Sequence, residues 1–185
     1  MDKPQGQRTC LYDTDDLDAV LSDMARQTAG LLTGRKQIAI VGLLRRGAPL
    51  AEMLRDRLVR NYGIANLPLY KLHVKRYADD LTLLHPETEL TESAEQAALD
   101  LTDATVVVVD DVLYHGHSLL KAVEYLARKN PLEIRTVVLA DRGVTRLPIR
   151  ADITGMRLDI APQDIIECNV PPYEPEFRID LLQPD

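Results

Sequence analysis

The sequence has few cysteines and no long hydrophobic run. Cys10 and Cys168 are the two cysteines, and their wide separation fits no metal-ligand spacing. No stretch approaches the roughly 18 apolar residues of a membrane span, and residues 1–8 lack the apolar segment of a secretory signal. We therefore expect a cytoplasmic protein with reduced cysteines and no contact with a membrane.

The chain also lacks an excess of positive charge. It carries 22 basic and 29 acidic residues, which gives a formal net charge of −7. Because non-specific nucleic-acid binding depends on phosphate neutralisation, this balance argues against indiscriminate binding but permits a local basic face. With 185 residues, 45% of them hydrophobic, the chain fits a single compact domain with its own core.

Strand patterns alternate with helical patterns along the chain. The first helix is expected to begin near residues 14–16, which offer candidate caps. Further helices are expected from Pro49 to about Gly63 and from about Ser118. Strands are expected at residues 38–42, 67–74, 105–109 and 136–140, with shorter ones near 165–170 and 177–182. This order predicts an α/β fold with a mainly parallel sheet that is covered on both faces.

Three of the expected strands end in polar turns that contain glycine. These turns are Arg45-Arg46-Gly47, the segment 110–118, and Asp141-Arg142-Gly143. In such sheets ligands bind beyond the carboxyl ends of the strands. We therefore expect the three turns to converge on one binding edge.

The segment 106–118 is the most informative part of the sequence. A run of four valines leads to Asp110-Asp111, and a turn containing Gly116 leads into the next helix. The amides and dipole of a helix start form a seat for phosphate, to which His115, His117 and Ser118 can add donors. The two carboxylates can accept hydrogen bonds from sugar hydroxyls and hold Mg²⁺. The segment therefore suits a ribose 5-phosphate.

This segment resembles the ribosyl-pyrophosphate signature of type I phosphoribosyltransferases. Three further segments resemble the bacterial pyrimidine-operon attenuator and uracil phosphoribosyltransferase family, namely 42–47, 77–82 and 141–152. The resemblance covers roughly residues 14–170. It implies the type I phosphoribosyltransferase fold over residues 1–185, with a lid at 78–103 and a small hood at 160–185. It also implies transfer of ribose 5-phosphate from 5-phosphoribosyl-1-pyrophosphate (PRPP) to a nucleobase, with uracil expected, through an oxocarbenium-like transition state.

The resemblance also assigns roles to residues. Asp110, Asp111 and Arg46 would act in catalysis, with Mg²⁺ held indirectly by the two acids through ribose hydroxyls or water. Tyr77, Asp79 and Asp80 would belong to the lid. PRPP would be bound by Arg45, Arg46, Gly47, Asp110, Asp111, Val112, Leu113, Tyr114, His115, Gly116, His117 and Ser118. The nucleobase would be bound by Asp141, Arg142, Gly143, Arg146 and Ile149. Family members act as homodimers or larger assemblies such as homotetramers.

Two other functions are compatible with parts of the sequence. The family resemblance also implies an RNA-binding attenuator that senses uridine nucleotides on a leader mRNA, with Arg142, Arg146 and Arg150 as a local basic face. A response-regulator receiver also places acid pairs at strand ends. Such a receiver needs a phosphoacceptor on another strand end and a lysine opposite, whereas this chain has Asp141 followed by arginine and glycine. Tyr173 is expected to pack within the proline-rich tail.

Overall fold

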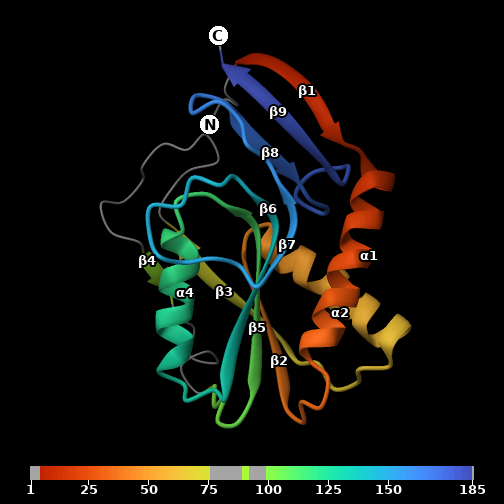
Figure 1. Cartoon of the computed structure of the whole chain (residues 1–185), viewed down its shortest axis with the longest axis vertical. Coiled ribbons are helices and arrows are strands. Elements are labelled where there is room, and N and C mark those ends of the chain that lie inside the picture. The colour runs from red at the N-terminus through yellow and green to blue at the C-terminus, as the bar shows by residue number, and fades with distance from the viewer. Residues whose placement is uncertain (1–4, 76–88, 92–98, 185) are drawn as a thin grey trace.

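The computed structural model describes residues 5–75, 89–91 and 99–184. These residues form a six-stranded sheet with helices on both faces and a separate three-stranded sheet (Figure 1). The smaller sheet lies beyond the carboxyl ends of the main parallel strands, at the top of Figure 1. The two sheets therefore flank the edge where the sequence predicts the site.

The main sheet is parallel except at one edge. Its strand order is β4-β3-β2-β5-β6-β7, in which only β4 runs antiparallel to its neighbour. The central strand β5 extends through the acid pair, which the sequence analysis had placed after the strand. The bounds are β2 Ile38–Leu44, β3 Leu69–Lys75, β4 Glu89–Thr91, β5 Thr105–Leu113, β6 Glu133–Asp141 and β7 Ile153–Arg157.

Helices cover the two faces of this sheet and divide its core. On one face lie α1 (Thr14–Leu31) and α2 (Gly47–Tyr62), and on the other lies α4 (His117–Ala127) (Figure 1). Because strand side chains alternate, Val107 and Val109 pack with α1 and α2, whereas Val106 and Val108 pack with α4. The valine run of β5 is therefore buried on both sides, as expected for a central parallel strand.

The three-stranded sheet forms a hood. It is antiparallel in the order β1-β9-β8, with bounds Gly6–Tyr12, Arg178–Pro184 and Ile165–Asn169 respectively. The hood, which the sequence predicts only for the tail, therefore also includes β1, the first strand of the chain. β1 is not predicted from the sequence, because most of its residues are exposed and its pattern lacks the alternation of a half-buried strand.

The predicted α/β fold with a mainly parallel sheet is confirmed. The cap of α1 is Asp13 rather than a residue of 14–16, and it forms a capping box with Asp16. The short strands β4 and β7 were also missed. The lid residues Tyr77, Asp79 and Asp80 lie outside the described residues. Within the described part of the chain, no helix has the length and apolar character to cross a bilayer.

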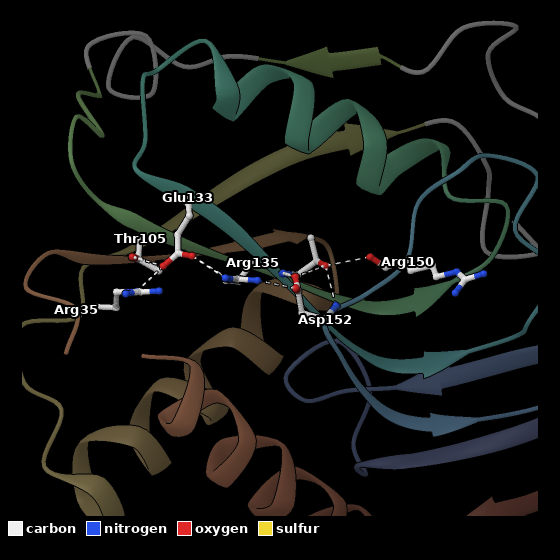
Figure 2. Close-up of polar contacts among 7 residues, drawn as sticks. Arg35, Thr105, Glu133, Arg135, Arg150 and Asp152 are labelled. Carbon is white, nitrogen blue, oxygen red and sulfur yellow. Dashed lines mark hydrogen bonds and ion pairs between the residues drawn. The ribbon is translucent and has the colours of Figure 1, made fainter. Parts of the chain in front are cut away.

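At the amino ends of β5, β6 and β7, polar and charged side chains form a connected network (Figure 2). Glu133 accepts hydrogen bonds from the Thr105 hydroxyl at 3.0 Å and from Arg135 Nη2 at 2.7 Å, and it forms an ion pair with Arg35 at 2.5 Å. Asp152 accepts from Arg135 Nη1 at 3.2 Å and from the backbone N–H of Thr136 at 2.7 Å. This network ties three strands and the loop before β2 together.

Candidate active site

The three polar turns meet at the carboxyl edge of the main sheet, as the sequence predicts. The turn after β2 lies against the end of β5, since a Cβ placed on Gly47 would lie 2.7 Å from the Val109 carbonyl oxygen. The turn after β6 is joined to the loop after β5 by two backbone bonds. Arg142 N–H donates to the Leu113 carbonyl at 3.1 Å, and Arg146 N–H donates to the His115 carbonyl at 3.1 Å.

The acid pair at the end of β5 is half-buried and electrostatically strained. The Asp111 N–H donates to Asp110 Oδ1 at 3.0 Å, which orients the Asp110 carboxyl group. Burial and the neighbouring charge of Asp111 raise the pKa of Asp110 well above its usual range. Burial also raises the pKa of Asp111, although the Asp110 side chain and the charge of Arg46 oppose that shift. The two acids therefore share a site in which holding both charges is costly.

The two acids face different parts of the edge. Asp110 lines a small pocket of about 40 Å³ together with residues 112–119, which include Gly116 and Ser118. Asp111 does not line this pocket and lies within electrostatic reach of Arg46. Asp110 thus opens toward residues 112–119, and Asp111 faces the turn that carries Arg46.

The start of α4, beside Asp110, has the features of an anion-binding helix terminus. Its N-cap is Gly116 at φ +88°, a conformation that glycine adopts without strain, and no side chain caps the helix. A Cβ at Gly116 would lie 2.5 Å from Ile149 Cγ2, so any other residue here would be strained at this φ and would require Ile149 to shift. The first amides of α4, together with the helix dipole, are suited to a phosphate group.

The turn after β2 is held by the C-terminal part of the chain. Arg46 Nη2 donates to Glu174 Oε1 at 2.6 Å, and Arg46 Nε lies 3.2 Å from both carboxylate oxygens. The guanidinium carbon of Arg45 lies 5.2 Å from the centre of the Tyr173 ring. Glu174 was not singled out in the sequence. Tyr173 is 43% exposed and faces Arg45, which corrects its expected role in packing the tail.

The turn after β6 is mostly folded inward. Asp141 is buried and accepts from the Gly143 N–H at 2.8 Å, and Arg157 lies 3.6 Å from its other oxygen. Arg142 is only 3% exposed and donates to the Asp164 carbonyl at 3.0 Å. Burial lowers the pKa of Arg142. Of the predicted nucleobase residues, Gly143 and Arg146 are exposed, and Ile149 packs against Gly116.

Arg142 supports the loop that follows β5. Its guanidinium carbon lies 4.5 Å from the centre of the Tyr114 ring, and that ring stacks on His115 at 3.8 Å with an interplanar angle of 22°. Because Arg142 is enclosed, it cannot contribute to the basic surface suggested by the sequence. Arg146 and Arg150 are exposed.

The donors at this edge fit the expected Mg²⁺ ion in an indirect role. Carboxylate oxygens are ligands that Mg²⁺ prefers, and a nearby cation would relieve the repulsion between Asp110 and Asp111. Among the described residues, no group of three or more acids, histidines or cysteines is gathered that could hold a metal ion. The residues therefore fit an ion that takes its remaining ligands from substrate and water. Both cysteines are free, and Cys168 is buried.

Comparison with known proteins identifies the class. The family model described as a phosphoribosyl transferase domain matches residues 10–176. The structure is similar to hypoxanthine phosphoribosyltransferase from Trypanosoma cruzi in complex with IMP, with a TM-score of 0.75 and 15% identity, covering 100% of this chain and 98% of that one. A hypoxanthine phosphoribosyltransferase from Staphylococcus aureus gives a TM-score of 0.67 and 18% identity, covering 81% and 77%. The fold is that of the type I phosphoribosyltransferases.

Relatives in sequence narrow the assignment. The "Bifunctional protein PyrR" of Deinococcus radiodurans is 31% identical over 179 residues, which cover 96% of this chain and 96% of the relative. The "Bifunctional protein PyrR" of Haemophilus influenzae is 34% identical over 147 residues, covering 78% and 82%. The chain belongs to the PyrR family of phosphoribosyltransferases.

Proposed function

We propose that the protein transfers the 5-phosphoribosyl group of PRPP to a nucleobase, with uracil as the acceptor, and releases pyrophosphate. The observation that carries this proposal is the joint placement of Asp110 and the start of α4 on one pocket. Carboxylate acceptors suit the vicinal hydroxyls of a ribose, and helix amides suit its 5-phosphate. Family membership supports the same reaction class.

The leaving group would be received by the turn after β2. Arg46 provides positive charge there, and its influence on Asp111 places that charge beside the acid pair. Pyrophosphate departs as a polyanion, so positive charge positioned before the reaction stabilises the transition state. Mg²⁺, held through Asp110 and Asp111, would neutralise part of the same charge when it is bound.

The acids would also stabilise the sugar. An oxocarbenium-like transition state carries positive charge on the ribose, and the ionised form of Asp110 or Asp111 lowers its energy. The nucleobase nitrogen forms the new bond to the anomeric carbon as the bond to pyrophosphate breaks, and the proton of that nitrogen is released to water, so no covalent enzyme intermediate is required. The turn around Gly143 and Arg146 is the part of the edge proposed to face the base.

Pyrophosphate release provides the test. The full chain is incubated with PRPP, MgCl₂ and a panel of uracil, cytosine, hypoxanthine and adenine, and we expect release with uracil. A matched control is Glu124→Gln, an exposed acid of α4 that pairs with Arg128 and does not line the pocket. Release with hypoxanthine alone would contradict the choice of acceptor. Absence of release with every base, together with no PRPP binding by calorimetry, would contradict the reaction class.

A second candidate function is a uridine-nucleotide-sensing RNA-binding attenuator. The relatives carry the name "bifunctional", and Arg146 and Arg150 are exposed on the turn after β6. Because the chain is acidic overall, such binding would have to use this local charge. A mobility-shift titration with the upstream leader RNA, with and without uridine monophosphate, tests it. Binding that ignores the nucleotide, or that disappears at moderate salt, would contradict it.

A further inference from the structure

Glu174 occupies the edge of Arg46 that an anion would use. The hydrogen bonds to Glu174 involve Nε and Nη2, the pair of nitrogens that binds carboxylates and phosphates in a bidentate manner. Both side chains are largely enclosed, at 17% and 9% exposure for Arg46 and Glu174 respectively. This pair therefore differs from a solvent-exposed ion pair, because water does not compete freely for either partner.

The carboxylate of Glu174 is fixed by its own backbone turn. Glu174 Oε2 accepts from the Val170 N–H at 2.9 Å, and the N–H groups of Tyr173 and Glu174 donate to the Val170 carbonyl at 3.1 and 3.3 Å. Despite the opposing effect of burial, the hydrogen bonds from Arg46 and Val170 lower the pKa of Glu174. The carboxylate is thus held as an anion at the end of β8, independently of any ligand.

The same turn also holds the neighbouring arginine. Tyr173 lies beneath Arg45, and the positive charge of Arg45 contributes to the lowered pKa of Glu174. Segment 170–176 therefore contacts both arginines that precede Gly47. If Arg46 leaves, Glu174 still keeps the Val170 amide and the nearby charge of Arg45.

We propose that Glu174 is an internal substitute for the leaving pyrophosphate. It holds Arg46 in the ligand-free protein and gives up the Nε and Nη2 donors when the polyanion binds. The inference rests on the proposed function, because it assumes that pyrophosphate reaches the turn at residues 45–47. Its consequence is that binding is an exchange, so the observed affinity for pyrophosphate is lower than Arg46 alone would give.

The affinity of Glu174→Gln for inorganic pyrophosphate tests the exchange. Glutamine retains the size of the side chain and removes the charge that competes for Arg46. We expect the variant to bind magnesium pyrophosphate about 5- to 30-fold more tightly than the wild type, as measured by calorimetry on the full chain. Glu176→Gln is the matched control, since Glu176 lies two residues away, is 64% exposed and pairs with Arg178. Its affinity should be unchanged.

Each result of this titration has a defined meaning. Tighter binding by the Glu174 variant alone supports the exchange. Unchanged or weaker binding by a variant that keeps the wild-type melting temperature overturns it and makes Glu174 only a support for Arg46. Failure of the wild type to bind either pyrophosphate or PRPP would instead contradict the proposed function.

A second measurement uses the wild type and does not depend on whether the variant folds. The Nε–H signal of Arg46 is followed by ¹⁵N nuclear magnetic resonance and is assigned by its loss in Arg46→Lys. On saturation with magnesium pyrophosphate we expect this signal to move, because its acceptor changes from carboxylate to phosphate. A signal that stays at its ligand-free position while pyrophosphate binds overturns the exchange.

Discussion

At the two ends of strands β5 and β6, half-buried carboxylates have opposite electrostatic surroundings. At the amino ends, hydrogen bonds from Thr105, Arg135 and Arg35 outweigh burial and lower the pKa of Glu133 (Figure 2). At the carboxyl end of β5, burial and mutual repulsion raise the pKa of Asp110. The sheet therefore carries a carboxylate with nearby cations at the amino ends of its strands, and an acid pair with little compensating charge at the carboxyl end of β5.

This difference separates stability from function between the two ends of the sheet's central strands, β5 and β6. A carboxylate that is satisfied by its neighbours contributes to folding, whereas two adjacent acids with little compensation cost folding free energy. Proteins retain such a destabilising acid pair at functional sites, where a bound ligand supplies the partners that the folded chain lacks. The sharpest way to test the comparison is to neutralise one acid at each edge and to follow activity and stability separately.

The largest expected effect is the loss of activity when the acid that lines the pocket is neutralised. Asp110→Asn removes the charge that would face the ribose and Mg²⁺, so we expect kcat/KM for pyrophosphate release to fall by about 100-fold or more. Because a costly charge is removed, the free energy of unfolding should stay unchanged or rise by about 1 kcal/mol. Steady-state kinetics and urea unfolding measure the two quantities. A less stable variant with full activity would contradict the comparison.

The matching change at the other edge should reverse this pattern. Glu133→Gln leaves Arg35 and Arg135 without their shared anion, so we expect the free energy of unfolding to fall by about 1–3 kcal/mol. The turnover number should remain near the wild-type value, since Glu133 lies at the amino ends of the strands. Urea unfolding measures the stability of this variant, and pyrophosphate release measures its turnover number on the same preparation. Loss of activity without loss of stability would show that the two edges are coupled.

The pH dependence of stability should sharpen the comparison further. Asp110 has a raised pKa in the folded protein, so its contribution is fully present below pH 3.8, its ordinary pKa, and is lost as the pH rises through the folded value. Glu133 has a lowered pKa, so its contribution is present above pH 4.5 and is lost as the pH falls through the folded value.

Because the two pKa shifts have opposite directions, the stabilities of the two variants relative to the wild type should diverge as the pH rises. In urea unfolding from pH 3.5 to 8, Asp110→Asn should gain stability over the wild type as the pH rises. Glu133→Gln should lose stability relative to the wild type over the same rise. Both differences should shrink toward acid pH, where the native carboxyl groups are protonated. A flat difference for either variant would mean that its carboxyl group does not titrate differently in the folded and unfolded states.

Sequence patterns predicted the central features of this edge, because they are local. The valine run, the acid pair and Gly116 follow one another within β5 and the start of α4, so strand and turn chemistry suffice to place them. Glu174 could not be found in this way. Its partner Arg46 is 128 positions away, and the contact exists only because the hood folds back over the sheet. Arg142 was misjudged for a similar reason, since only the packed structure reveals that Tyr114 and Asp164 enclose it.

The smallest expected effect concerns the Ser118 hydroxyl at the start of α4. Ser118 lies in the first turn of α4 and lines the pocket, but the amides of that turn remain when its side chain is shortened. Ser118→Ala should therefore raise the KM for PRPP by about 3- to 10-fold, the value of one hydrogen bond, with little change in kcat. Thr33→Ala is a control, because Thr33 lies just after α1, does not line the pocket, and its hydroxyl donates locally to the Ala29 carbonyl. If Ser118→Ala instead lowered kcat by the factor expected for Asp110→Asn, the hydroxyl would act on the transition state. The start of α4 would then contribute to catalysis as well as to PRPP binding.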